Sequence, residues 1–254
     1  MHKEILEDWN FNILNIYNFN KPGSLEYYFK FIKKNLNKLD GDLIEAGVHN
    51  GKSLIATAIF LKKIKSKKII YAYDTWSGFP SGYKDHQLDK FNNWDTMLKN
   101  KIITRGHYNQ IKKNIKIIKF LKKNKKSLNS FNLSSSLDFS NCSIKELERK
   151  IKFLNLNNIK LIKGDFKNTM ISGLGPKKIM CALIDADLYE SYKVSLPFIW
   201  KKLSAKGLIF LDEYYSLKFP GARIATDNFF KNKKQKPMIL SNKKFEFERW
   251  GVFK

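Results

Sequence analysis

The sequence predicts an α/β fold with a mostly parallel, twisted sheet and helices on both faces. Short apolar runs typical of buried strands alternate with stretches of helical apolar spacing. Acidic residues directly follow several of these runs. They would lie at the carboxyl ends of the strands, which is where parallel sheets bind their ligands. With 254 residues, 43% of them hydrophobic, the chain is expected to form a single domain over residues 1–254.

The elements are expected in a regular order after a helical lead-in over residues 1–40, in which Ser24 is a predicted N-cap. Helices are predicted at 52–62 and 189–203, between strands at 43–47, 68–74, 160–162, 179–184 and 208–211. Residues 237–240 and the alternating run 245–250 predict an antiparallel hairpin that turns at Ser241-Asn242. The sheet would then have about seven strands.

Residues 81–140 interrupt this alternation and are predicted to form an inserted cap or lid. The connection is much longer than a crossover helix needs, and long connections in compact domains are usually functional or disordered. Residues 111–121 have helical spacing, whereas 127–143 are rich in serine and asparagine. The alternative is a surface segment that has no functional role.

The formal net charge of +25 would suit an acidic partner such as nucleic acid. The lysines are nevertheless spread over all parts of the chain, which indicates a compositional bias more than a binding patch. Nucleic acid is therefore not the expected partner, and a small-molecule or sugar substrate is favoured. A homo-oligomer is compatible with the sequence.

The two cysteines, Cys142 and Cys181, argue against a disulfide framework and against a zinc site. Acidic residues near the N-terminus do not suit a signal peptide, and no run approaches ~18 apolar residues. We expect a cytoplasmic protein without a membrane span.

A glycine-containing loop, Glu45 to Ser53, lies between the first predicted strand and the first predicted helix, where glycines allow a ligand to approach the backbone. It has too few glycines for a dinucleotide fingerprint and misses the spacing of a phosphate-binding loop by one residue. Asp74, at the end of the next strand, could accept hydrogen bonds from both ribose hydroxyls of a nucleoside ligand. An ordinary strand-terminal carboxylate is the alternative.

Acidic residues also follow two later strands, as Asp185-Ala186-Asp187 and as Asp212-Glu213. If these strands are neighbours, their carboxylates converge, and a hard cation such as Mg²⁺ or another divalent ion would relieve the repulsion. Capping of the following helix is the alternative, above all for Asp187.

Several segments, in order along the chain, resemble the macrocin O-methyltransferase family. The segments are residues 45–53, 74–80, 163–169, 185–191, 211–214 and 220–223 together with Asp227. The resemblance implies a Rossmann-like class I methyltransferase fold. It also implies metal-dependent transfer of a methyl group from S-adenosylmethionine to a hydroxyl, typically on a sugar.

The resemblance also implies roles for individual residues. Asp185, Asp212 and Glu213 take the metal positions, although Glu213 is longer than the usual aspartate or asparagine. The expected cofactor-binding residues are Glu45, Ala46, Gly47, Val48, Gly51, Ser53, Asp74, Thr75, Gly164, Asp165 and Phe166. Among these, Asp74 holds the ribose, Gly47, Val48 and Ser53 line the methionine end, and Asp165 and Phe166 flank the adenine.

In the expected mechanism, a metal held in part by the catalytic Asp185 lowers the pKa of the acceptor hydroxyl and orients it toward the sulfonium methyl. Asp187 is the candidate general base, with His86 and His107 as further candidates. Two other functions stay open. The acid-x-acid pattern at 185–187 also suits a metal-dependent nucleotide-sugar glycosyltransferase, and the charge suits an RNA methyltransferase.

Overall fold

The structure is a computed structural model that describes residues 7–83, 86–122, 128–129, 132–243 and 246–254. Within these residues, seven strands form one sheet in the order β3-β2-β1-β4-β5-β7-β6. The strands are β1 (Asp42–Ala46), β2 (Ile70–Asp74), β3 (Ile159–Lys163), β4 (Ile179–Ile184), β5 (Leu203–Leu211), β6 (Met238–Ser241) and β7 (Arg249–Phe253). The first five run parallel, whereas β7 is antiparallel to both β5 and β6. The predicted α/β fold is confirmed.

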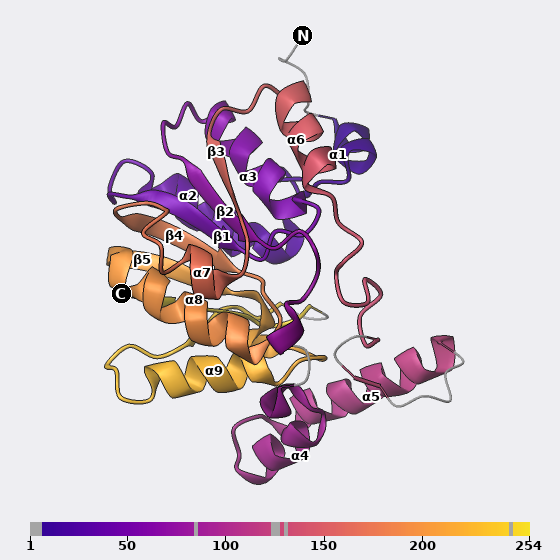
Figure 1. Cartoon of the computed structure of the whole chain (residues 1–254). Coiled ribbons are helices and arrows are strands. Elements are labelled where there is room, and N and C mark those ends of the chain that lie inside the picture. Colours follow the sequence, from indigo (N-terminus) through magenta and orange to yellow (C-terminus); the bar gives the residue numbers. More distant parts are fainter. Residues whose placement is uncertain (1–6, 84–85, 123–127, 130–131, 244–245) are drawn as a thin grey trace.

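Helices cover both faces of the sheet (Figure 1). One face packs against α1 (Asp8–Leu14), α2 (Glu26–Asn35), α3 (Lys52–Lys63) and α6 (Ile144–Phe153). The other packs against α7 (Phe166–Thr169), α8 (Tyr189–Lys202) and α9 (Gly221–Phe230). All six residues of β4 are buried, which explains why this central strand is a continuous apolar run without alternation.

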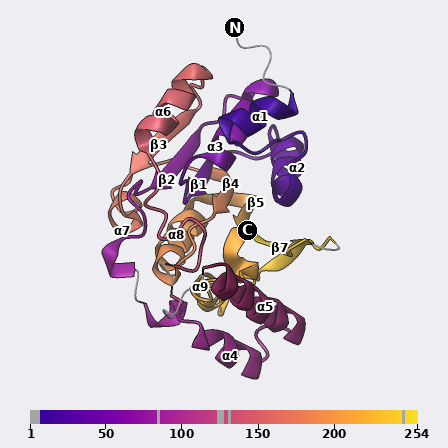
Figure 2. The same cartoon turned by 90° about the vertical axis from the view of Figure 1, so that its right-hand side faces the viewer.

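The insertion after β2 contains two further helices, α4 (Asn92–Lys99) and α5 (Arg105–Leu121). They lie beside α9, away from α1 and α6 (Figures 1 and 2). A small apolar cluster joins them to the rest of the protein: Trp94, Met97 and Ile111 are buried there, and Ile224 of α9 packs against them. Part of the serine- and asparagine-rich stretch lies outside the described residues.

Two details differ from the sequence prediction. Ser24 does not cap a helix but lies inside a 3-10 turn, η1 (Gly23–Leu25), which leads directly into α2. The C-terminal pair of strands does not turn at Ser241-Asn242, because β6 ends at Ser241 and β7 begins only at Arg249. Phe245, the start of the predicted second strand, lies outside the described residues. The alternating pattern located the antiparallel pair but not its connection.

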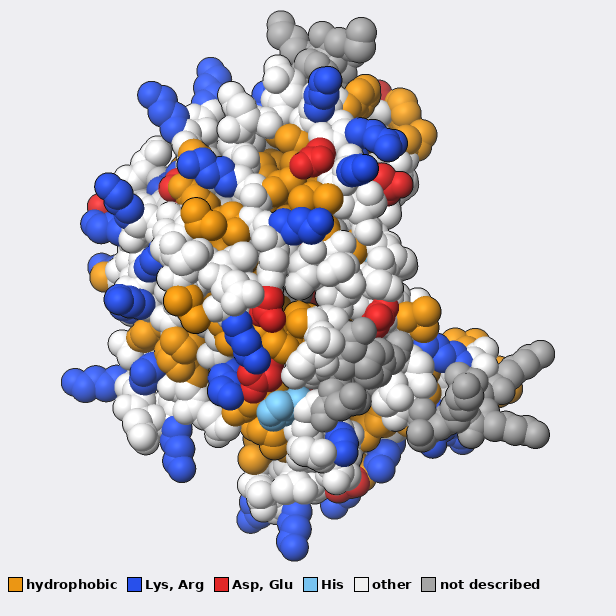
Figure 3. All heavy atoms as spheres, viewed as in Figure 1, with side chains coloured by type: hydrophobic (Ala, Val, Ile, Leu, Met, Phe, Trp, Pro, Cys, Tyr) orange, Lys and Arg blue, Asp and Glu red, His pale blue; other side chains and the backbone are white. Residues whose placement is uncertain are grey.

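Lysine and arginine side chains are distributed over the whole face seen in Figure 3 and do not gather in one patch. This dispersion is what a compositional origin of the positive charge predicts. Among the helices that the structure describes, none is long and apolar enough to cross a membrane.

Candidate functional site

The register of the sheet brings the carboxyl ends of its central strands to one level. Ala46 of β1 pairs with Ile184 of β4, which in turn pairs with Leu211 of β5. The residues that follow the strands therefore emerge side by side at the edge where α/β folds bind ligands. Those that follow β1, β4 and β5, together with the last residue of β2, are Gly47, Asp185, Asp212 and Asp74.

Gly47 is in direct contact with the acidic segment. It has a φ of +87°, and a Cβ atom built on it would lie 1.8 Å from the carbonyl oxygen of Asp185. Both the left-handed backbone and the close approach require glycine here. The glycine loop after β1 and the acidic turn after β4 are therefore two walls of one site.

A cavity of about 310 Å³ lies between these walls, within the size range of small-molecule sites. Eight of the predicted site residues line it: Gly47, Val48, Ser53, Asp74, Thr75, Phe166, Asp185 and Asp187. The predicted residues Glu45, Ala46, Gly51, Gly164 and Asp165 adjoin these in sequence but do not line the cavity. Most of the expected cofactor site is thus brought together.

Asp74 fixes the backbone of the glycine loop. Its Oδ2 atom accepts the N–H groups of Val48 at 2.7 Å and His49 at 2.8 Å, and its Oδ1 atom accepts the N–H of Trp76 at 2.7 Å. A carboxylate has about four lone-pair positions, so acceptor capacity remains for a ligand hydroxyl. The arrangement suits a group that orders the loop and contacts a bound ribose.

Glu45 lies beneath the loop and is fully buried. Its Oε1 atom accepts the hydroxyl of Ser53 at 2.6 Å, whereas Oε2 has no hydrogen-bond partner. Burial raises the pKa of Glu45 to about 8, because the charged form is poorly solvated there. At neutral pH this carboxyl is therefore mostly protonated.

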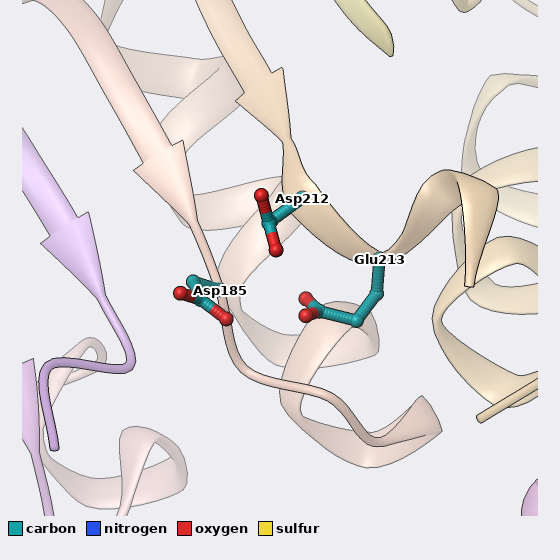
Figure 4. Close-up of side chains that lie close together, drawn as sticks. All are labelled: Asp185, Asp212 and Glu213. Carbon is teal, nitrogen blue, oxygen red and sulfur yellow. The ribbon is translucent and has the colours of Figure 1, made fainter. Parts of the chain in front are cut away.

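Three carboxylates converge at the ends of β4 and β5. Asp185, Asp212 and Glu213 point toward one another, as Figure 4 shows. Each offers one oxygen, and these oxygens lie within 4.8 Å of one another. Ligands about 2.1 Å from Mg²⁺ are at most about 4.2 Å apart, so small adjustments would suffice to bind such an ion.

Burial and mutual repulsion strongly affect the ionisation of this cluster. Burial raises the pKa of Asp185 well above its usual value, and the charge of Asp212 raises it further. Burial, and then the negative charge of Asp185, also raise the pKa of Glu213 well above its usual value. The oxygens of Asp185 and Glu213 lie within 4.8 Å of each other, so a negative charge on one raises the pKa of the other. A cation between them would relieve this repulsion.

Comparison with known proteins identifies the family of the chain. The profile of the macrocin O-methyltransferase family (TylF) matches residues 118–244, half of the chain. The chain belongs to this family. It is an S-adenosylmethionine-dependent O-methyltransferase, as the resemblance implied, and not a nucleotide-sugar glycosyltransferase. A search of curated proteins finds no match.

Solved structures show the same fold for O-methyltransferases of low sequence identity. NovP is 19% identical, with a TM-score of 0.60 over 89% of this chain and 78% of NovP. CalS11, a calicheamicin methyltransferase, is also 19% identical, with a TM-score of 0.52 over 98% of this chain and 80% of CalS11. An O-methyltransferase from Bacillus cereus in complex with SAH is 11% identical, with a TM-score of 0.51 over 99% of this chain and 94% of that one.

Two neighbouring side chains hold the acidic cluster of the methyltransferase in place. The hydroxyl of Tyr192 lies 3.0 Å from Oε2 of Glu213 and accepts the N–H of Glu213 at 3.3 Å. The guanidinium of Arg249 pairs with Asp212 at 3.2 Å. No pattern in the sequence marks either residue: Tyr192 follows the acidic segment without a distinguishing motif, and Arg249 comes from the far C-terminal strand.

Asp187, the predicted general base, is buried and lines the cavity. Its φ of +57° is left-handed, which is uncommon for a residue with a Cβ atom. Burial raises its pKa to about 7, while the positive charge of Lys218 acts in the opposite direction. Its side chain does not cap α8, whose N-cap, Leu188, has no side-chain hydrogen bond.

The two histidines considered as bases lie elsewhere. His107 is buried, its Nε2 lies 2.8 Å from the carbonyl oxygen of Ser216, and burial lowers its pKa to about 4. It connects α5 to the segment before α9. His86 stacks on Tyr189 at 4.5 Å between ring centres and lies 3.5 Å from Glu190. Neither histidine lines the cavity.

Segments outside the central sheet complete the cavity. Asn15 and Tyr17 come from the N-terminal lead-in, and Tyr83 and Phe139 come from the insertion after β2. The Tyr83 hydroxyl donates to Asp165, whose Oδ1 also accepts the N–H of Lys167 as the N-cap of α7. No periodic pattern marks these residues in the sequence, so they could be found only through the fold.

Proposed function

We propose that this enzyme methylates a hydroxyl of a sugar or of a glycosylated small molecule, with the assistance of a divalent cation. The observation that carries the proposal is the convergence of Asp185, Asp212 and Glu213 beside the cavity that the glycine loop lines. The sugar is supported by relatives in structure: CalS11 is described as a TDP-rhamnose 3'-O-methyltransferase. CalS11 shares the fold of this chain, and a sugar substrate is assigned to this chain only as part of this proposal.

The donor occupies the cavity between β1 and β2 in this proposal. Asp74 accepts hydrogen bonds from the ribose hydroxyls, Phe166 packs on the adenine, and Gly47 allows the methionine part to approach the backbone. The neutral carboxyl of Glu45 holds Ser53 beneath the methionine part. These contacts place the sulfonium methyl toward Asp185, the residue shared by the cavity and the acidic cluster.

The acidic cluster fits a hard divalent cation, because its donors are all carboxylate oxygens and their repulsion demands a positive charge. Asp185, Asp212 and Glu213 would hold the ion, with Tyr192 orienting Glu213. The chemistry that it would supply there is Lewis acidity, which would lower the pKa of the acceptor hydroxyl.

Asp187 receives the proton of the acceptor hydroxyl in this proposal, because its carboxylate lines the cavity two residues after Asp185. Phe79, together with Tyr83 and Phe139 of the insertion, excludes water from the transfer and contacts the acceptor. The region 81–140 then acts as the lid that the long connection predicts.

Titration with Mn²⁺, followed by the electron paramagnetic resonance of the free ion, tests the cation site. Asp212→Asn and Glu213→Gln keep the size of the side chains and remove one charge each. We expect them to weaken Mn²⁺ binding by about 10- to 100-fold and to leave S-adenosylhomocysteine binding within about threefold. Asp95→Asn, an exposed acid on α4, is the control. Wild-type protein that binds no Mn²⁺ would refute the cation.

Mass spectrometry of a panel of nucleotide sugars and glycosides, incubated with deuterated S-adenosylmethionine and Mn²⁺, tests the acceptor class. A trideuteromethyl product from a sugar hydroxyl, suppressed by a chelator, is expected. Methylation of catechols but of no sugar would contradict the acceptor class, and full activity in excess chelator would contradict the cation.

A further inference from the structure

Asp89 lies in the insertion, far from the acidic segments in sequence, yet its carboxylate is buried against the starts of two helices. It ends a short 3-10 turn, η3 (Gln87–Asp89), and its side chain is 6% exposed. Its Oδ1 and Oδ2 atoms lie 3.1 and 3.2 Å from the N–H of Tyr189, the first residue of α8. The backbone of Gly221, the first residue of α9, lies against the same carboxylate.

Neither helix has a capping side chain of its own. The N-cap of α8 is Leu188 and that of α9 is Pro220, and no side-chain hydrogen bond is made at either position. The first N–H groups of a helix have no partner within the helix and need an external acceptor. The macrodipoles of both helices also favour a negative charge at this place. Asp89 therefore caps α8 through hydrogen bonds and places its negative charge at the start of α9.

The position of the Asp89 carboxylate requires a glycine at residue 221. A Cβ atom on Gly221 would lie 1.9 Å from Oδ1 of Asp89 and 2.7 Å from Cβ of Tyr189. Only a residue without a side chain allows α9 to begin this close to both the acid and α8.

These two helices are the ones that follow the acidic turns. Asp185 lies four residues before Tyr189, and the turn between them includes Asp187 with its left-handed φ of +57°. Asp212 and Glu213 form the turn η4 (Asp212–Tyr215), which leads through a short segment into α9. A shift of either helix start would move one acidic turn relative to the other.

We propose that Asp89 is a positioning residue that locks the starts of α8 and α9 together and thereby sets the spacing of the acidic cluster. This role for the cluster rests on the proposed cation site. Through the same contact, the insertion that walls the cavity is joined to the carboxylates at its edge. Asp89 itself lines no part of the cavity.

Hydrogen exchange tests the capping contact without any ligand. In Asp89→Ala, the amides of Tyr189 and Gly221 and of the turns before them are expected to exchange about tenfold faster, because Tyr189 loses its acceptor and the start of α9 loses the adjacent negative charge. Asp89→Asn keeps an acceptor oxygen and should restore most of the protection. Thr104→Ala, which removes the N-cap of α5 within the same insertion, is the matched control and should change only the start of α5.

Mn²⁺ binding tests the functional consequence. Asp89→Ala is expected to weaken it by about 10- to 100-fold, as the loss of a residue that supports metal ligands does, while S-adenosylhomocysteine affinity stays within about threefold. Asp89→Asn should recover most of the Mn²⁺ affinity, and Thr104→Ala should keep it. A Thr104→Ala protein that loses as much affinity as Asp89→Ala would show a general loss of stability and overturn the proposal.

Other results also decide the proposal. Unchanged exchange or unchanged Mn²⁺ affinity in Asp89→Ala would overturn it. If the wild type binds no Mn²⁺, the proposed cation fails, while the exchange data still decide whether Asp89 holds the starts of both helices. If Asp89→Ala does not fold, Gly221→Ala takes its place, because its Cβ atom displaces the Asp89 carboxylate. A folded Gly221→Ala protein with wild-type exchange and Mn²⁺ affinity would then refute the role of Asp89.

Discussion

Replacing Gly47 with alanine tests whether the glycine loop and the acidic turn are rigidly joined. The new Cβ atom would lie 1.8 Å from the carbonyl oxygen of Asp185 and 2.6 Å from its carbonyl carbon. Both are main-chain atoms after a fully buried strand, so the loop and the turn must separate by about 1 Å to reach an acceptable contact. The φ of +87° adds about 1–2 kcal/mol and the overpacking about 1–3 kcal/mol. We therefore expect the free energy of unfolding to fall by about 2–5 kcal/mol.

Gly173 provides the matched control for this experiment. Its φ is +75°, but a Cβ atom there would meet nothing within 4 Å, so Gly173→Ala incurs only the conformational cost. Urea unfolding measures both variants, and calorimetry measures their affinity for S-adenosylhomocysteine. Gly47→Ala is expected to lose binding and Gly173→Ala to keep it. Equal destabilisation of the two variants, or wild-type binding by Gly47→Ala, would refute the argument from close contact.

Three further predictions concern single buried contacts. Glu45 has a pKa of about 8 when folded against about 4.5 when unfolded, so its contribution to stability is lost as the pH rises through this window. Glu45→Gln should therefore show a smaller decrease in unfolding free energy between pH 5 and pH 8 in urea titrations, and an unaltered slope would contradict the assignment. Tyr83→Phe removes the donor to Asp165 and should weaken S-adenosylhomocysteine binding by about 5- to 10-fold in calorimetry. An unchanged affinity would show that this contact does not shape the donor site. His107→Ala should lower the free energy of unfolding by about 1–3 kcal/mol and leave that affinity intact, because His107 packs in the core; lost binding would argue otherwise.

The elements predicted correctly from the sequence are those whose signal is local. The strand at 179–184 was placed to the residue because a continuous apolar run bounded by polar residues marks a buried strand. The acids at 185 and 212 were expected to converge if their strands are neighbours, because parallel strands end at one edge, and β4 and β5 do pair. Where the apolar pattern covers only part of a strand, the predicted bounds differ from the observed ones: β5 begins at Leu203, five residues before the predicted start at 208.

The unpredicted residues are those whose partners lie far along the chain. Asp89 caps a helix whose first residue is 100 positions away, and Arg249 pairs with an acid 37 positions before it. Neither contact leaves a periodic trace, since one polar residue in a loop looks like any other. Asp89 even resembles an ordinary surface acid until the fold buries it.

The distribution of charge gives an independent argument for a cation at this site. Six of the 23 acidic residues gather at the carboxyl edge of the sheet, where, among the described residues, Arg249 pairs with Asp212 and the charge of Lys218 acts on Asp187. These six acids are Glu45, Asp74, Asp185, Asp187, Asp212 and Glu213. Arg249 pairs with Asp212, and the phenol of Tyr17 stays uncharged beside these acids, because burial and then the charges of Asp185 and Asp212 raise its pKa to about 12. Arg249 and Lys218 are thus few cations for an edge with six acids in a protein whose net charge is +25. The negative charge that remains on the ionised carboxylates suits a site for a sulfonium donor and a divalent ion, and it would repel a polyanion.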